Sequence, residues 1–387
     1  MLWEMSGSTG HAGGGAAPGL SRAPDEAPSA ARPEEELTGL TLLLDCRWLG
    51  HGGAGRVTEL LLGEMRANPP SAGQWILWGD PAAIAPFIFA RAVIEPWHGH
   101  PARLSGQADW LRVPRAEVRI YLHQVRPLRP GRSITMVYDT IPLHVETRPI
   151  VRLAKRTFLK VVCRLSQQVV TISAQSRESI TRDLGVRGSK IIMVGLSVDA
   201  GRVARIRAMR ATADRTDTVI YVGRFGAHKN LERLARAYAT TAFHVRGGRL
   251  LLVGGSPAEV DQLESWIREQ GIAGVEVRGF LSEAELDLLF ATSRALVQPS
   301  LEEGYGLPAV EAAAVGLPVA ASRTGYASEI PGELVTFMDP RDERSIAAAI
   351  DIAVVRPAPV LAFMPRSTLR EGVLEAVART VRPRGTR

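Results

Sequence analysis

The feature that most constrains the fold of this chain is an alternation of short apolar runs with helical patterns, which occurs twice along the 387 residues. Apolar runs such as Leu40–Cys46 end in polar, glycine-rich turns, and segments with helical spacing such as Val151–Leu165 lie between them. This alternation is typical of parallel sheets covered by helices on both faces. The sequence therefore predicts an α/β chain with two doubly wound, Rossmann-like domains that face each other across a cleft.

Shifts in composition place the domain boundaries. Residues 1–37 are rich in Gly, Ala, Pro, Ser and Glu, which predicts a disordered tail. Residues 38–200 and 217–355 carry the two alternating patterns, and the polar, arginine-rich segment 201–216 is predicted to link them. Residues 356–387 are predicted to form a helical tail, with no obvious helix that returns to the first domain. Ligands of such sheets bind at the carboxyl ends of the strands, so the chemistry is expected in the cleft.

Charge and cysteine content narrow the class of protein only a little. The net charge of +7 comes mostly from arginine, and it fits either phosphate-bearing ligands or the arginine use of a GC-rich genome. Cys46 and Cys163 lie in apolar runs without Cys-x-x-Cys spacing, so neither a disulfide framework nor a zinc site is expected. Neither a signal-peptide core nor a run of about 20 apolar residues occurs. We expect a cytoplasmic protein.

The stretch EGYGLPAVE places two acids around a turn that opens a helix. It follows the strand-like run RALVQPS, and Pro308 suits the first turn of a helix because its missing N–H would be unpaired there. The free N–H groups of such a helix start favour a phosphate or a sugar oxygen. A single acid that complements the helix dipole would explain Glu311, but it would not explain Glu303 and the two glycines Gly304 and Gly306 as well.

Two further stretches follow predicted strands. In VGRFGAHKN, Gly223 and Arg224 end a strand and Lys229 begins a helix, so two cations suit a diphosphate, although two solvated surface cations would look the same. In GGAGRVTELL, Gly53 and Gly55 open a helix. This is a fragment of a dinucleotide fingerprint, and an ordinary tight turn between strand and helix explains it equally well.

Taken together, these stretches resemble the GT-B glycosyltransferases of the large retaining family 4, over nearly all of residues 38–350. The E-x7-E pattern from Glu303 to Glu311 is the most specific part of the resemblance. Such enzymes move a sugar from a nucleotide diphosphate sugar to an acceptor. The resemblance thus implies a GT-B fold with a C-terminal donor domain and an N-terminal acceptor-side domain.

The resemblance also implies roles for individual residues. Arg224 and Lys229 are expected to neutralise the donor diphosphate, Glu311 to bind the ribose, and Glu303 to lie beside the transferred sugar as a nucleophile or as a stabilising charge. The remaining implied residues are Gly223, Tyr305, Gly306 and Leu307 for donor binding, Gly53 and Gly55 in the N-terminal glycine loop, and Asp139 and His123 on the acceptor side.

The implied reaction is the retaining transfer of a hexose to a saccharide or lipid-linked acceptor, in polysaccharide or glycolipid synthesis, with mannose as the expected sugar. Placed cations and helix N–H groups would stabilise the charge that develops on the leaving diphosphate. The sequence lacks Asp-x-Asp, a P-loop and a G-x-S-x-G motif, and no metal or other cofactor is expected. A nucleotide-sugar epimerase and a non-catalytic nucleotide-sugar-binding partner remain as alternatives. A nucleic-acid binder is not indicated, because aromatics are few and no such motif appears.

The segment Val151–Leu165 has a basic stripe formed by Arg152, Arg156, Lys160 and Arg164. Two interpretations stay open for it. The helix lies on an anionic membrane, at the inner face of the cell membrane, where lipid-linked acceptors are found. Alternatively, it packs on its own sheet and leaves its basic face in water.

Overall fold

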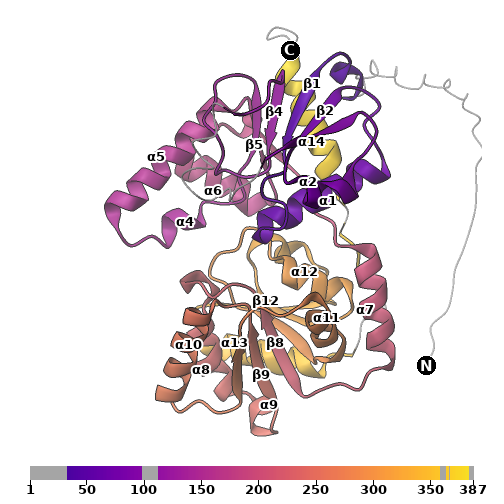
Figure 1. Ribbon diagram of the computed structural model, residues 1–387. Helices are drawn as coiled ribbons and strands as arrows, with labels where there is room; N and C mark the ends of the chain where they lie inside the picture. The colour runs from indigo at the N-terminus through magenta and orange to yellow at the C-terminus, as the bar shows by residue number, and fades with distance from the viewer. Residues whose placement is uncertain (1–32, 98–111, 358–362, 366, 383–387) are drawn as a thin grey trace, which may run out of the picture. The chain divides into compact units, whose positions relative to one another are not determined.

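The first half of the molecule is built on a seven-stranded parallel sheet in the order β3-β2-β1-β4-β5-β6-β7 (Figure 1). A computed structural model describes residues 33–97, 112–357, 363–365 and 367–382. The strands are β1 (Thr41–Asp45), β2 (Gln74–Gly79), β3 (Ala92–Pro96), β4 (Val118–Tyr121), β5 (Ser133–Met136), β6 (Gln168–Thr171) and β7 (Ile191–Met193). The helices among them are α1 (Gly52–Ala67), α2 (Pro81–Ile84), α4 (Ile141–His144), α5 (Pro149–Leu165) and α6 (Ala174–Leu184).

The second sheet has six parallel strands in the order β10-β9-β8-β11-β12-β13. They are β8 (Thr218–Val222), β9 (Arg249–Val253), β10 (Val275–Arg278), β11 (Ala295–Gln298), β12 (Val319–Ser322) and β13 (Val335–Met338). The helices are α7 (Ala200–Thr212), α8 (Leu231–Ala239), α9 (Ala242–Val245), α10 (Pro257–Glu269), α11 (Glu283–Thr292), α12 (Leu307–Ala314) and α13 (Glu343–Val355). Short 3-10 turns are η1 (Glu35–Leu37), η2 (Ala85–Phe87), η4 (Gly188–Lys190), η5 (Ala227–Lys229) and η6 (Gly325–Glu329).

Local sequence explains why these elements form. The central strands are buried along most of their length, as in Leu42–Leu44 of β1 and Leu250–Val253 of β9, because helices cover both faces of each sheet. Ser282 accepts from the Glu285 backbone N–H, and the Glu285 carboxylate accepts from Ser282 in return, so a capping box starts α11 as its sequence predicts. The predicted α/β class with two parallel, doubly wound sheets is confirmed.

Two elements escaped the sequence prediction for simple physical reasons. Strand β3 lies at the edge of its sheet and is largely exposed, and it ends at Pro96, so it lacks the apolar continuity of a buried strand. The segment 201–216, predicted as a linker without strand pattern, is occupied by helix α7 over most of its length. Val203 and Ile206 are buried on one side of α7, while Arg207 and Arg210 donate to backbone carbonyls in α12 and α11.

The ends of the described chain also differ from expectation. Residues 33–37 were assigned to the disordered tail, but Leu37 in η1 is fully buried and Glu34 forms an ion pair with Arg370. The folded unit therefore begins by Pro33, and the rest of the predicted tail lies outside the described residues.

Helix α14 (Leu369–Val381) returns to the first sheet and packs against β5, β6 and β7 (Figure 1), so the expectation of no returning helix was wrong. Gly372 looks like a helix breaker in the sequence. In the structure α14 approaches β7 so closely at this point that a Cβ atom would collide with Val194. The glycine is thus a requirement of packing, and the buried side chains Leu369, Val373 and Val377 follow helical spacing around it.

Candidate functional site

The predicted site residues lie at the carboxyl ends of neighbouring strands. Strands β8 and β11 are adjacent in the second sheet, and they are followed by Gly223-Arg224 and by the loop that carries Glu303. In the first sheet, β1, β4 and β5 are adjacent, and they precede the glycine loop, His123 and Asp139. The strand order therefore brings residues far apart in the sequence to one edge of each sheet, where ligands of such sheets bind.

The carboxylate of Glu303 is held in place by three donors. Lys229 Nζ donates to Glu303 Oε2 over 2.6 Å, Ser300 Oγ over 3.0 Å and Gln298 Nε2 over 3.2 Å. Both members of the Lys229–Glu303 pair are largely buried, with side chains 15% and 12% exposed. The predicted diphosphate cation and the predicted sugar-side acid therefore form one charge-assisted pair, and Ser300 and Gln298 fix its orientation.

The turn after Glu303 depends on glycine at position 306. Gly306 has φ 85° and precedes α12, which contains Pro308 in its first turn as predicted. A Cβ atom at Gly306 would lie 2.6 Å from Gln298 Nε2, the group that bonds Glu303. The buried Tyr305 hydroxyl donates to the Leu196 carbonyl over 2.8 Å and accepts from its N–H over 3.2 Å. Tyr305 therefore anchors this turn to the backbone of Leu196. Leu307 is the first residue of α12.

Glu311 lies in α12 and is bound by an arginine from α7. Arg202 Nη1 contacts Glu311 Oε1 at 2.9 Å, and Arg202 Nε donates to Asp287 of α11 over 2.7 Å. The Glu311 side chain keeps 19% of its surface exposed. Arg202 therefore sets the position of the acid that was predicted to bind ribose, which the sequence pattern of α12 alone could not indicate.

Arg224 follows a backbone turn that also needs glycine. Gly223 has φ 150°, and a Cβ atom there would lie 2.9 Å from the Tyr221 hydroxyl, which donates to the Arg224 carbonyl. The Arg224 side chain is exposed, unlike Lys229. The structure therefore does not join the two predicted diphosphate cations to each other, and only Lys229 contacts Glu303.

Asp139 is brought to the Glu303 loop from the first sheet. Its Oδ2 lies 2.7 Å from the place that a Cβ atom of Gly304 would occupy, and its Oδ1 accepts from the Ile141 N–H. Asp139 and Glu303 line one cavity of about 240 Å³, together with His144, Gln175 and Glu302. Burial raises the pKa of Asp139 to about 6, and the negative charge of Glu303 adds to this effect.

His123 and the glycine loop take up other positions. The His123 ring stacks on Trp48 with 3.9 Å between ring centres, and burial lowers its pKa to about 4, so it is neutral at pH 7. Gly55 packs its Cα close to the Trp48 carbonyl, where a Cβ atom would collide. Gly53 is exposed and has open space around it at the start of α1. The glycine loop and His123 are thus connected through Trp48.

The structure also shows contacts that sequence reasoning missed. Ser173 Oγ donates to the Gly304 carbonyl over 2.7 Å and Ser176 Oγ does so over 3.3 Å, from the start of α6. His144 contacts Glu302 at 2.7 Å and Asp183 at 2.9 Å. The stretch TISAQS places Ser173 between a predicted strand and a predicted helix, where a site residue could be expected. No motif in the sequence indicates that His144 takes part in the site.

Two polar atoms near Glu303 are buried without a hydrogen-bond partner among the described residues, namely His228 Nδ1 and Gln298 Oε1. Such orphaned groups are what a ligand would satisfy. In the same described part of the chain, no group of three or more His, Cys, Asp or Glu side chains is placed to hold a metal ion. The expectation of metal-free chemistry stays a prediction.

Comparison with known proteins agrees with this geometry. Residues 204–357 match the family model for glycosyl transferases group 1. The O-antigen chain mannosyltransferase B of Escherichia coli is 27% identical over 190 residues, which cover 47% of this chain and 50% of that protein. The mannosyltransferase RfbU of Salmonella typhimurium is 26% identical over 234 residues, which cover 59% of this chain and 62% of that protein. The chain thus spans about half to three fifths of the length of these relatives.

Solved structures define the fold over most of the chain. Anabaena HepE, in complex with UDP and glucose, superposes with a TM-score of 0.59 at 17% identity, covering 88% of this chain and 94% of HepE. Sucrose-phosphate synthase from Thermosynechococcus elongatus gives a TM-score of 0.62 at 18% identity, covering 87% and 94% of the two chains. The two sheets with their facing strand ends are therefore those of a GT-B protein. Within that fold, the match of residues 204–357 to the glycosyl transferases group 1 agrees with the resemblance to GT-B glycosyltransferases seen in the sequence.

Proposed function

We propose that this chain is a glycosyltransferase that takes a hexose from a nucleotide diphosphate sugar and transfers it, with retention, to a saccharide or lipid-linked acceptor. The observation that carries the proposal is the largely buried Lys229–Glu303 pair, which joins η5 to the loop before α12, inside the segment that matches the family. The names of the relatives support mannose as the sugar, whereas HepE was solved with UDP and with UDP-glucose.

In this proposal Lys229 changes partner when the donor binds. The bond between the anomeric carbon and the diphosphate oxygen breaks, and a bond from the acceptor oxygen to the anomeric carbon forms. The proton of the acceptor hydroxyl passes to the leaving phosphate oxygen. Lys229, Arg224 and the N–H groups at the start of α12 stabilise the negative charge that develops on the diphosphate. Glu303 faces the sugar, and Glu311 faces the ribose while Arg202 holds it.

The acceptor side belongs to the cavity of about 240 Å³ that Asp139 and Glu303 share. Its lining is polar and includes Gln175, Ser176 and Glu178. Carboxylates, amides and hydroxyls are suitable partners for sugar hydroxyl groups. We therefore place the acceptor hydroxyl beside Asp139.

A donor panel and one variant test the proposal. Incubation with UDP-, GDP-, ADP- and TDP-sugars should raise the melting temperature for one base, because ligand binding to the folded state stabilises it. Lys229→Ala should lower kcat by about 10²-fold, the scale of losing one charge-stabilising group. Arg187→Ala, an exposed arginine away from these residues, serves as the control. Unchanged turnover in Lys229→Ala would contradict the diphosphate assignment.

Product analysis distinguishes transfer from epimerisation, which needs no acceptor, and from binding without turnover.

A membrane-bound acceptor is supported by the surface of α5. Ile150 and Leu153 are 83% and 66% exposed, and Lys160 and Arg164, which helical spacing places on the same side of α5, are exposed as well. Leu159, Val162 and Cys163 bury the opposite side of the helix. Apolar and basic side chains on one exposed helix surface suit an anionic membrane. No described helix has the length and apolarity needed to span a membrane.

Flotation with liposomes tests this part separately. Wild-type protein should float with vesicles containing anionic lipid, and Ile150→Asp/Leu153→Asp should abolish this while leaving transfer to a soluble acceptor intact. Val245→Asp, an equally exposed apolar residue on α9, is the control. Equal behaviour with anionic and neutral vesicles would rule out the proposed contact.

A further inference from the structure

An arginine-rich pocket lies at the opposite edge of the second sheet from the candidate site. Its cavity of about 500 Å³ is lined by residues that immediately precede strands, including Asp217 before β8 and Arg294 before β11. The candidate site lies beyond the carboxyl ends of these same strands. The pocket is therefore separate from the proposed donor site, and none of the residues assigned there lines it.

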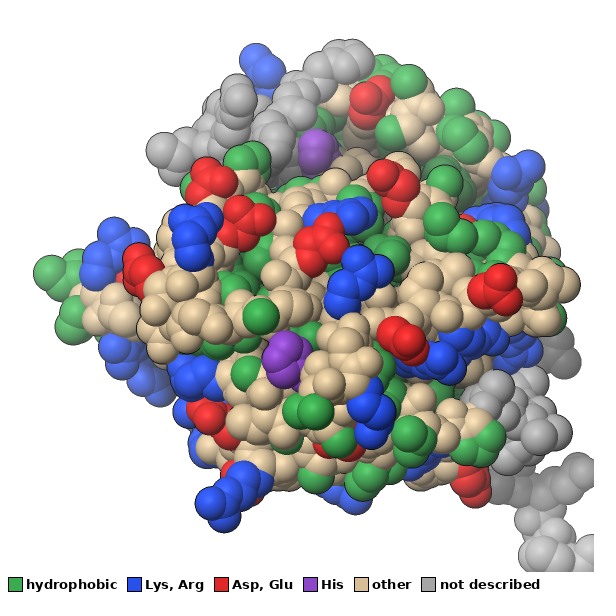
Figure 2. All heavy atoms as spheres, turned by 90° about the horizontal axis from the view of Figure 1, so that it is seen from below, with side chains coloured by type: hydrophobic (Ala, Val, Ile, Leu, Met, Phe, Trp, Pro, Cys, Tyr) green, Lys and Arg blue, Asp and Glu red, His purple; other side chains and the backbone are tan. Residues whose placement is uncertain are grey.

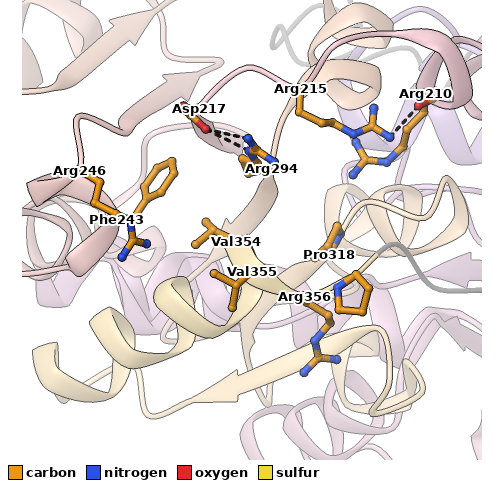
Figure 3. A pocket seen from close by; sticks show the side chains of 11 residues that line it. Arg210, Arg215, Asp217, Phe243, Arg246, Arg294, Pro318, Val354, Val355 and Arg356 are labelled. Atoms are coloured by element: carbon orange, nitrogen blue, oxygen red, sulfur yellow. Dashed lines mark hydrogen bonds and ion pairs between the residues drawn. The ribbon is translucent and has the colours of Figure 1, made fainter.

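The charge of this pocket is strongly one-sided. Five arginines and one carboxylate line it, namely Arg210, Arg215, Arg246, Arg294, Arg356 and Asp217 (Figure 3). Asp217 pairs with Arg294 at 3.0 Å. Seen from the α9 side, the surface of the molecule carries acidic and basic side chains side by side (Figure 2). The excess of positive charge is thus a property of the pocket and not of the whole face.

The other arginine contacts are with neutral groups, so they leave the charge uncompensated. Arg210 donates to the carbonyls of Phe290 and Ser293, and Arg356 donates to the Gly332 carbonyl and the Thr336 hydroxyl. Capping the carbonyls at the end of α11 explains Arg210 and Arg215, but it does not explain Arg246, Arg294 or Arg356.

Donor groups remain for a ligand. A guanidinium has five N–H groups, and the contacts of Arg356 with described residues use two of its nitrogen atoms. Arg246 is exposed and lies across the pocket from Arg215 and Arg210 (Figure 3). Burial and the neighbouring positive charge of Arg294 lower the pKa of Arg215.

The pocket also has an apolar wall. Phe243, Pro318, Val354 and Val355 contribute to its lining, and Val355 is 70% exposed. Arginine forks match the geometry of phosphate oxygens, and an apolar wall favours an organic group attached to the phosphate. We propose that this pocket binds a phosphorylated small molecule, with the phosphate at Arg246 and Arg294 and its organic part against Val354 and Val355.

Calorimetry on the full chain tests this site independently of the donor site. The measurements use Lys229→Ala as the background, which weakens phosphate binding in the proposed donor site. Phenyl phosphate should bind this variant, and more tightly than inorganic phosphate does. Adding Arg246→Ala and Arg294→Ala should weaken phenyl phosphate binding at least tenfold. Adding Arg187→Ala and Arg268→Ala, which removes the same charge from exposed positions elsewhere, should change it less than twofold.

Two results would overturn the assignment. One is an equal loss of affinity in the two pairs of variants, which would mean unspecific ion pairing. The other is equal affinity for inorganic and phenyl phosphate, which would exclude the apolar wall as part of the site. Arg246→Gln/Arg294→Gln replaces the alanine pair if that pair lowers the melting temperature. Failure of the proposed transferase activity would leave these results unaffected, because they do not depend on turnover.

Discussion

At the scale of single residues, the candidate site is a set of carboxylates held by both charged and neutral donors. Glu303 has Ser300 and Gln298 besides Lys229, and Asp139 has the Ile141 N–H. A neutral donor fixes a carboxylate without cancelling its charge, so Asp139 stays available to a substrate, whereas Glu303 shares its charge with Lys229. Of these residues, Glu303, Lys229 and Asp139 could be predicted from motifs. The supporting donors could not, because serine and glutamine are common in loops of any function.

Asp139 gives a stability prediction at this scale. Its pKa is about 6 in the folded protein, above the ordinary value of 3.8. The protonated form is therefore favoured by folding, and stability falls as pH rises from about 4 towards 6. Asp139→Asn keeps the shape and removes the charge, so it should raise the melting temperature at pH 7.5. The gain corresponds to at most about 3 kcal/mol and should shrink by half or more at pH 4.5.

Melting curves of both proteins at the two pH values provide the measurement. Asp261→Asn, an exposed carboxylate on α10, is the matched control and should change little at either pH. A gain for Asp139→Asn that is the same at pH 4.5 and pH 7.5 would mean that the carboxyl is not titrating in this range.

At the scale of elements, the strands and helices with strong apolar periodicity were predictable and the exceptions were not. The apolar run QWILWG forms strand β2, and its residues are buried along most of its length. Strand β3 is exposed at an edge, and α14 contains a glycine that packing requires, so local pattern was misleading for both. Tertiary contacts, which a single sequence does not display, decided these two elements.

Helix α12 supplies the prediction at this scale. Gly306→Ala places a side chain at φ 85° and within 2.6 Å of Gln298 Nε2. The strained backbone costs of the order of 1 kcal/mol or more, and displacement of Gln298 should also disturb Glu303. We expect lower stability and at least tenfold weaker binding of the nucleotide diphosphate that the donor panel identifies.

The control variant introduces a similar backbone strain but does not crowd any neighbouring side chain. Gly185→Ala, at the end of α6, has φ 71° and nothing within 4 Å of the added Cβ atom. It should lower the melting temperature and leave nucleotide affinity unchanged. Equal affinities in the two variants would show that the position of Gln298 does not matter for the donor site.

At the scale of the whole molecule, residues 33–387 form one compact unit in which the Glu303 loop bonds to the first half of the chain. Ser173 and Ser176 bind the Gly304 carbonyl, and Tyr305 binds Leu196. The sequence predicted two domains and a cleft, but the contacts that join them depend on which loops meet. No periodicity or motif in either half encodes that meeting.

A further contact between the Glu303 loop and the first half of the chain, from Glu302 to His144, is expected to depend on pH. Burial lowers its pKa, but the hydrogen bonds to Glu302 and Asp183 outweigh this effect and raise the pKa above the ordinary value. A raised histidine pKa stabilises the folded state below about pH 6.5, and the stabilisation is lost as pH rises through the folded-state pKa. The pair with Glu302 should therefore contribute at pH 5.5 and lose its ionic part at pH 8.5.

A double-mutant cycle with His144→Gln and Glu302→Gln measures this contribution. Because both side chains are about one third exposed, water screens the pair, and the coupling should be only about 0.3–1 kcal/mol at pH 5.5. At pH 8.5 the two substitutions should be close to additive. The pair Arg236–Glu343 is similarly exposed and contains no histidine, so its coupling should be the same at both pH values. If the His144–Glu302 coupling also stays constant, the contact is an ordinary hydrogen bond, and protonation of His144 does not help to hold the Glu303 loop against the first half of the chain.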